Sequence, residues 1–64
     1  METYRHWTVS IEQVAPLLWV ATAKYRGAHD LSATGTDEDD CREAIQARID
    51  FYWQGQFGEL GITP

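Results

Sequence analysis

The sequence has little cysteine and no long apolar segment. Only one of its 64 residues is a cysteine, so no disulfide can form within the chain, which fits a reducing compartment such as the cytoplasm. The longest apolar run covers residues 17–21, whereas a membrane-spanning helix needs roughly 20 apolar residues. Residues 1–4 resemble neither the basic nor the apolar part of a secretion signal. We therefore expect a cytoplasmic protein that does not enter membranes.

Basic residues are also scarce. Ten Asp and Glu residues against five Lys and Arg residues give a net charge of −5 at pH 7. Because nucleic acids and anionic membranes are bound through Lys and Arg, we expect the chain to bind neither directly. Half of the acidic residues lie between Asp37 and Glu43, so the negative charge is concentrated in one segment.

Apolar residues, in contrast, are numerous enough for a folded domain. They make up 44% of the chain, and 12% of all residues are aromatic. A chain of this length buries only about 60% of the surface that it exposes when unfolded, so its core is small. We expect one small domain over residues 1–64.

Two helices are predicted from the apolar spacing. Ser10 and Gln13 have the spacing of a capping box, and a helical stripe follows, made of Ile11, Val14, Leu18, Ala21 and Tyr25. Pro16 would kink this first helix or shift its start, and Gly27 would end it. Thr36 would cap a second helix that runs to about Gln54. Its buried stripe consists of Cys41, Ala44, Ile45, Ile49, Tyr52 and Trp53.

The two ends of the chain give weaker signals. Residues 4–9 have the composition of a short strand, whereas Gly55, Gly58 and Gly61 divide the C-terminal segment into turns. The predicted fold is therefore mainly α, with two helices joined by a short loop and with irregular or short β termini. The alternative is a small α+β fold in which strands at the two termini pair.

No pattern in the sequence predicts a catalytic, cofactor or metal site. Cys41 with His6 or His29 would be the only nucleophile–base pair of its kind, but the acidic neighbours of Cys41 disfavour a thiolate. The histidines and the cysteine lack zinc-site spacing. Asp37 and Asp39 look like the start of a calcium loop, but the later ligand positions do not fit. We therefore expect a protein that is not an enzyme and needs no cofactor.

The second predicted helix presents an acidic face. On a helical wheel Asp39, Glu43 and Asp50 fall within about 40° of one another and far from the buried stripe. Together with the acids at the helix start, these residues form an acidic ridge that could occupy the basic groove of a protein partner. The ridge consists of Asp37, Glu38, Asp39, Asp40, Glu43 and Asp50. The alternative is a solvated face that keeps a small protein soluble.

Three other residues point to an interface without identifying it. On the first predicted helix, Trp19 and Val20 lie outside the apolar stripe, so either the terminal segments, a second copy or a partner protein would cover them. Arg48 lies within the apolar stripe of the second helix, where it would stack on a ring or anchor an interface. The oligomeric state is left open between monomer and homodimer.

In length, acidic charge and lack of catalytic residues, the chain resembles the small anti-CRISPR proteins of phages and mobile elements, several of which mimic DNA. The resemblance concerns the general character of the chain, because that group shares no motif. It implies that the chain acts in the host cytoplasm and that its partner is a Cas subunit with a basic groove. The acidic ridge would pair with the Arg and Lys side chains of that groove. The alternatives are a self-associating structural module and an antitoxin-like or adaptor subunit.

Overall fold

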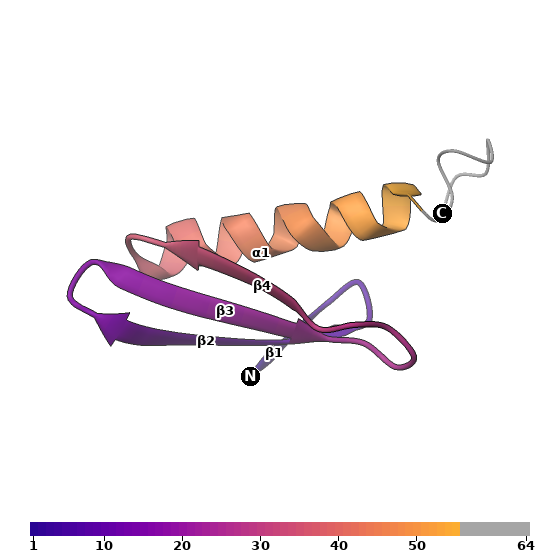
Figure 1. Cartoon of the computed structure of the whole chain (residues 1–64), viewed down its shortest axis with the longest axis horizontal. Coiled ribbons are helices and arrows are strands. Elements are labelled where there is room, and N and C mark those ends of the chain that lie inside the picture. Colours follow the sequence, from indigo (N-terminus) through magenta and orange to yellow (C-terminus); the bar gives the residue numbers. More distant parts are fainter. Residues whose placement is uncertain (56–64) are drawn as a thin grey trace.

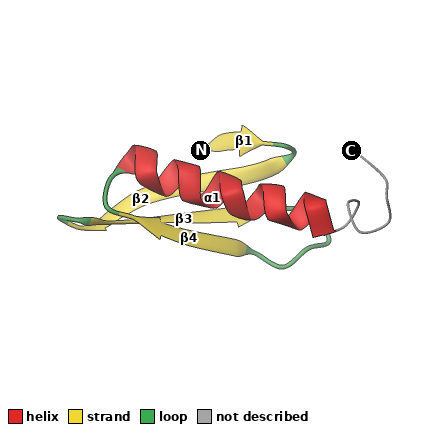
Figure 2. Cartoon of the chain, turned by 90° about the horizontal axis from the view of Figure 1, so that it is seen from above, coloured by secondary structure: helices red, strands yellow, loops and turns green. Residues whose placement is uncertain are grey.

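Four strands and one helix make up residues 1–55, the part of the chain that the computed structural model describes. The strands are β1 (Glu2–Tyr4), β2 (Trp7–Ala15), β3 (Leu18–Lys24) and β4 (Leu31–Gly35), and the helix is α1 (Glu38–Trp53). All neighbouring strands are antiparallel, in the order β1-β2-β3-β4, and α1 covers one face of the sheet (Figures 1 and 2). The predicted turns at Gly58 and Gly61 lie outside the described residues, as does any pairing of a C-terminal strand.

The prediction of a mainly α fold with two helices is wrong. The segment predicted as the first helix forms most of β2 and β3, which pair as a hairpin. Along β2 the buried Trp7 and Val9 alternate with the exposed Thr8 and Ser10. This period of two is that of a half-buried strand, and it outweighs the apparent helical stripe because one face of the sheet lies against α1.

Pro16 explains why the hairpin forms here. It lies in the two-residue turn between β2 and β3, where its fixed φ and missing N–H are tolerated. In a helix interior the same residue would cost about 3 kcal/mol. Just before the turn, the pairing passes from Gln13 opposite Trp19 to Ala15 opposite Leu18, so one residue of β2 bulges.

The turn between β1 and β2 is conformationally unusual. Its two residues, Arg5 and His6, have φ angles of 47° and 77°. Two-residue hairpin turns with positive φ at both positions favour Asn-Gly, since other residues pay about 1–2 kcal/mol each for this conformation. The sequence therefore gave no local signal for this hairpin.

The prediction of the second helix is confirmed, with a start one residue later than expected. Asp37 rather than Thr36 is the N-cap, and its Oδ1 accepts a hydrogen bond from the backbone N–H of Asp40 at 2.7 Å. The predicted stripe faces the sheet: Cys41, Ile45 and Ile49 are fully buried, and its other three members are half-buried. The core contains Trp7, Val9, Ala21, Ala23, Ala33, Cys41, Ile45 and Ile49.

Small residues on the sheet let α1 approach it closely. At Gly35 a Cβ atom would lie 2.5 Å from the backbone nitrogen of Cys41 and 2.7 Å from its Cα. The first turn of α1 therefore rests on the backbone of β4 itself. The opposite face of the sheet carries no helix among the described residues, and it is largely polar, with Thr8, Ser10, Thr22, Lys24, Ser32 and Thr34.

The close packing of α1 against Gly35 can be tested by adding one methyl group at this position. We expect Gly35→Ala to lower the free energy of unfolding by about 1–3 kcal/mol, because the methyl group would clash with backbone that cannot rotate away. Gly55→Ala is the matched control, since a Cβ there meets nothing within 4 Å. Urea denaturation of both variants measures the difference, and equal stabilities would contradict this packing.

Candidate protein-binding surface

The start of α1 gathers four carboxylates in one place. Asp37 caps the helix, and Glu38, Asp39 and Asp40 occupy its first turn, all of them exposed. The partial positive charge of a helix N-terminus favours acidic side chains at these positions. We call Asp37, Glu38, Asp39 and Asp40 the acidic start.

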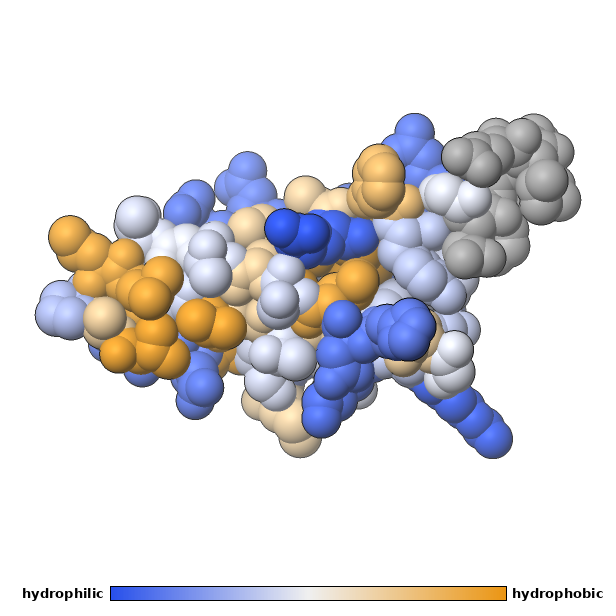
Figure 3. Space-filling view, viewed as in Figure 1, coloured by the Kyte–Doolittle hydropathy of each residue, from blue (hydrophilic) through white to orange (hydrophobic). Residues whose placement is uncertain are grey.

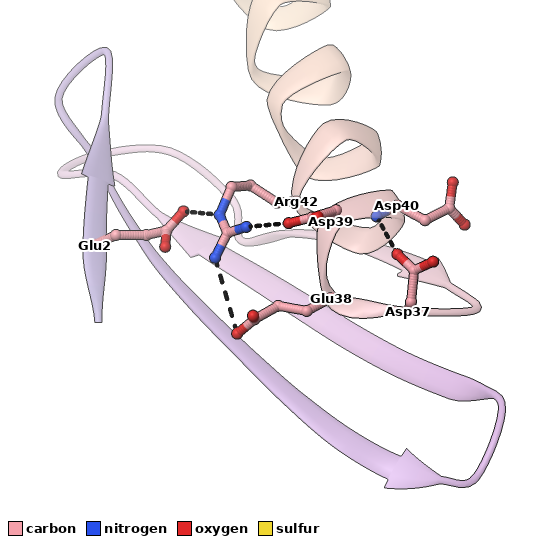
Figure 4. A network of polar contacts seen from close by, with 6 residues as sticks. All are labelled: Glu2, Asp37, Glu38, Asp39, Asp40 and Arg42. Atoms are coloured by element: carbon pink, nitrogen blue, oxygen red, sulfur yellow. Dashed lines mark hydrogen bonds and ion pairs between the residues drawn. The ribbon is translucent and has the colours of Figure 1, made fainter.

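Arg42 neutralises part of the acidic start. Its guanidinium group lies 2.9 Å from Glu2 of β1, 3.0 Å from Asp39 and 3.8 Å from Glu38 (Figure 4). The hydrogen bond to Glu2 and the surrounding carboxylates raise the pKa of Arg42. Asp40 points away from this network, and one of its oxygens accepts the backbone N–H of Thr36 at 3.0 Å. The carboxylates of Asp37 and Asp40 are therefore not tied to Arg42.

Asp50 lies elsewhere, although the helical wheel grouped it with these acids. Its Oδ1 accepts hydrogen bonds from Tyr4 Oη at 2.9 Å and from Arg5 Nη1 at 2.8 Å. The bond from Arg5 lowers the pKa of Asp50, and the bond to Asp50 raises the pKa of Tyr4. Asp50 thus attaches the β1–β2 turn to α1. Glu43 is exposed on α1 and makes no ion pair within residues 1–55.

An apolar surface lies beside the acidic start. At the β2–β3 turn, Leu17 is 77% exposed, and Val14, Pro16 and Leu18 are exposed around it. We call these four residues the apolar tip, which lies at the left end of the molecule in Figure 3. Because Gly35 pairs with Trp19 across β3 and β4, the β2–β3 turn and the start of α1 lie at the same end of the sheet (Figure 1). We call the apolar tip and the acidic start together the binding end.

The strand conformation separates Trp19 and Val20, which the sequence grouped as one apolar interface. Successive side chains of a strand point to opposite faces. Trp19 is half-buried and packs against the core beneath α1, whereas Val20 alternates with it and belongs to the open face of the sheet. The helical stripe from which both were predicted to protrude does not exist. Trp19 nevertheless adjoins the apolar tip.

A groove runs between α1 and β4. It is open to solvent, has a volume of about 750 Å³ and is lined by Leu31, Ala44, Ala47, Arg48, Phe51, Tyr52 and Gly55. Phe51 is 75% exposed, which is unusual for so large an apolar side chain. Arg48 is exposed in the wall of this groove and makes no ion pair with any residue from 1 to 55.

The residues considered for chemistry are not arranged as a reactive site. Cys41 is fully buried, and this burial raises the pKa of its thiol, whereas His6 and His29 are exposed. Within residues 1–55 no group of three or more His, Cys, Asp or Glu side chains is placed to hold a metal ion. In the same residues no helix has the length and apolar composition needed to cross a membrane.

The contacts of Asp50 predict a pH-dependent contribution to stability. Because its pKa is lowered in the folded protein, Asp50 stabilises the fold above its ordinary pKa of 3.8, and this contribution disappears as the pH falls through the lowered value. We expect Asp50→Asn to lower the free energy of unfolding at pH 7 by about 0.5–1 kcal/mol, since the pair is half exposed. At pH 2, below the ordinary pKa of 3.8, the difference from the unmodified chain should be smaller than at pH 7.

Denaturation at both pH values measures this effect. Asp30→Asn is the matched control, because Asp30 makes no ion pair with another described residue. A cost for Asp50→Asn that is the same at both pH values would contradict the assignment.

No protein-family model, no curated protein and no solved structure matches this chain.

Proposed function

We propose that the chain is a small protein-binding module that inhibits a partner carrying a basic, nucleic-acid-binding surface. The observation that supports this proposal is the composition of the binding end, where exposed apolar side chains lie beside a cluster of carboxylates. Leu17 has most of its surface in solvent, and the side chain of Asp39 is 94% exposed. An apolar tip on a small soluble domain is expected to be covered by another protein.

The two parts of the binding end would contribute differently. Burial of Leu17 and its apolar neighbours in a pocket of the partner would provide most of the affinity, at about 25 cal/mol per Å². The carboxylates would pair with Arg and Lys side chains around that pocket, which speeds association and excludes acidic surfaces. Asp39 and Glu43 are separated by one helical turn, about 6 Å, which is of the order of the spacing between backbone phosphates.

The class of partner that we propose rests on the resemblance in length and charge to small anti-CRISPR proteins. A Cas subunit that holds DNA or RNA in a basic groove has the required charge, and such a complex acts in the cytoplasm. The chain would then work by occupying the groove, without a chemical step. Arg42 pairs with both Glu38 and Asp39, but the side chain of Asp39 is 94% exposed against 55% for Glu38, so Asp39 stays more accessible to an Arg or Lys side chain of the partner.

Affinity capture followed by variant binding tests the proposal. The tagged chain is incubated with a nuclease-treated lysate of CRISPR-containing cells, and the recovered protein is purified and titrated against variants. We expect Leu17→Glu and Asp39→Lys each to weaken binding at least tenfold, or about 1.4 kcal/mol. Asp39→Lys should also reduce the salt dependence of binding, because it removes one charge pair.

Asp30→Lys is the control for Asp39→Lys, because it makes the same charge change in the loop before β4, at the far end of the sheet. The proposal predicts that this variant binds like the unmodified chain. Equal binding by all three variants, or an equal loss for Asp30→Lys and Asp39→Lys, would contradict it.

A further inference from the structure

β4 is an edge strand without the usual protection against pairing. No described strand pairs with its outer side, and it lies at the edge of the sheet in Figure 2. Natural edge strands are usually blocked by a charged residue, a proline, a bulge or very short length. The sequence of β4, Leu-Ser-Ala-Thr-Gly, contains neither charge nor proline, and its pairing with β3 is regular over all five residues. The opposite edge strand, β1, has only three residues.

The groove described above runs along the same edge. Leu31 of β4 forms one wall, and Ala47 and Phe51 of α1 form the other. A strand added beside β4 would form hydrogen bonds with the unpaired backbone groups on the outer side of β4. Side chains of the added protein that lie on the α1 side of the sheet would then pack against Phe51. This combination of an open edge and an apolar groove is the arrangement used for β-strand addition.

The charges around β4 indicate which occupant fits. The loop before β4 carries one basic and one acidic residue, Arg26 and Asp30, and Arg48 lines the groove together with Leu31. The residues after β4 form the acidic start, where the backbone of Asp40 packs on Gly35. The guanidinium group of Arg48 and the carboxylates of the acidic start therefore lie at opposite ends of β4.

We propose that two copies of this chain associate through β4, antiparallel to each other, to form one eight-stranded sheet. Antiparallel pairing about a twofold axis near Ala33 places Gly35 of one copy beside Leu31 of the other. Asp40 of each copy is thereby brought toward Arg48 of the second copy. The same twofold axis brings the two grooves together, so that the side chain of Phe51 becomes buried in each copy.

This dimer uses β4 and the groove rather than the apolar tip, and it takes only Asp40 from the acidic start, so it goes beyond the proposed function. It also gives Arg48 a partner, which this residue lacks among the described residues. In the dimer the two apolar tips stay free, and a bivalent inhibitor results.

Sedimentation velocity over a concentration series tests the dimer. The full chain should sediment at twice its 7.3 kDa mass at high concentration. Phe51→Glu should give a folded monomer, because the exposed ring contributes little to the fold of one copy. Leu17→Glu is the matched control, since Leu17 is equally exposed but lies at the apolar tip, and this variant should remain dimeric.

Charge reversal tests the direction of pairing. Arg48→Glu should weaken the dimer at least tenfold, and adding Asp40→Arg to it should restore association. A chain that is monomeric at every concentration would overturn the proposal. A dimer that persists in both Phe51→Glu and Arg48→Glu would also overturn it, as would a dimer that only Leu17→Glu abolishes.

Amide hydrogen exchange on the unmodified chain provides the second measurement, should Phe51→Glu fail to fold. Protection of β4 amides that rises with protein concentration is the expected result. If the β4 amides are already fully protected from exchange in the monomer, another part of the same chain occupies the edge. This result would also overturn the proposal.

Discussion

The contact between Gly35 and the first turn of α1 positions the other features of this molecule. Only a residue without a side chain lets the backbone of Cys41 come so close to the end of β4. The helix therefore begins directly at the end of the sheet, and Ala21, Ala23 and Ala33 leave room for it to continue across the sheet. As a result, the acidic start lies beside the β2–β3 turn. The same placement leaves the groove between α1 and the edge of β4.

Several charged residues that suggested a partner surface also stabilise the fold. Arg42 connects Glu2 of β1 to the acidic start, and Asp50 connects the β1–β2 turn to α1 through Tyr4 and Arg5. These contacts fasten the short strand β1, which has few residues to bury. Negative charge on the helix is therefore partly structural. The acids left for a partner are those near the apolar tip.

The sequence predicted α1 well because its signals are local. The acids of the first turn and the spacing of Cys41, Ile45 and Ile49 require no knowledge of the rest of the chain. The first predicted helix failed because the apolar residues of β2 and β3 satisfy helical spacing by chance, whereas the alternation of Trp7 and Val9 with polar residues and the position of Pro16 fit a hairpin. The apolar tip, the groove and the open edge of β4 depend on strand pairing, so periodicity along the sequence could not predict them.

Nuclear Overhauser spectroscopy of the isotope-labelled chain tests this account most directly. The packing of α1 on β4 predicts a strong contact between the Hα atoms of Gly35 and the amide proton of Cys41. It also predicts contacts across the sheet between residues paired in β2, β3 and β4, such as Ala21 with Ala33. Contacts between residues three apart along positions 11–25, without any between Gly35 and Cys41, would show a second helix and contradict the account.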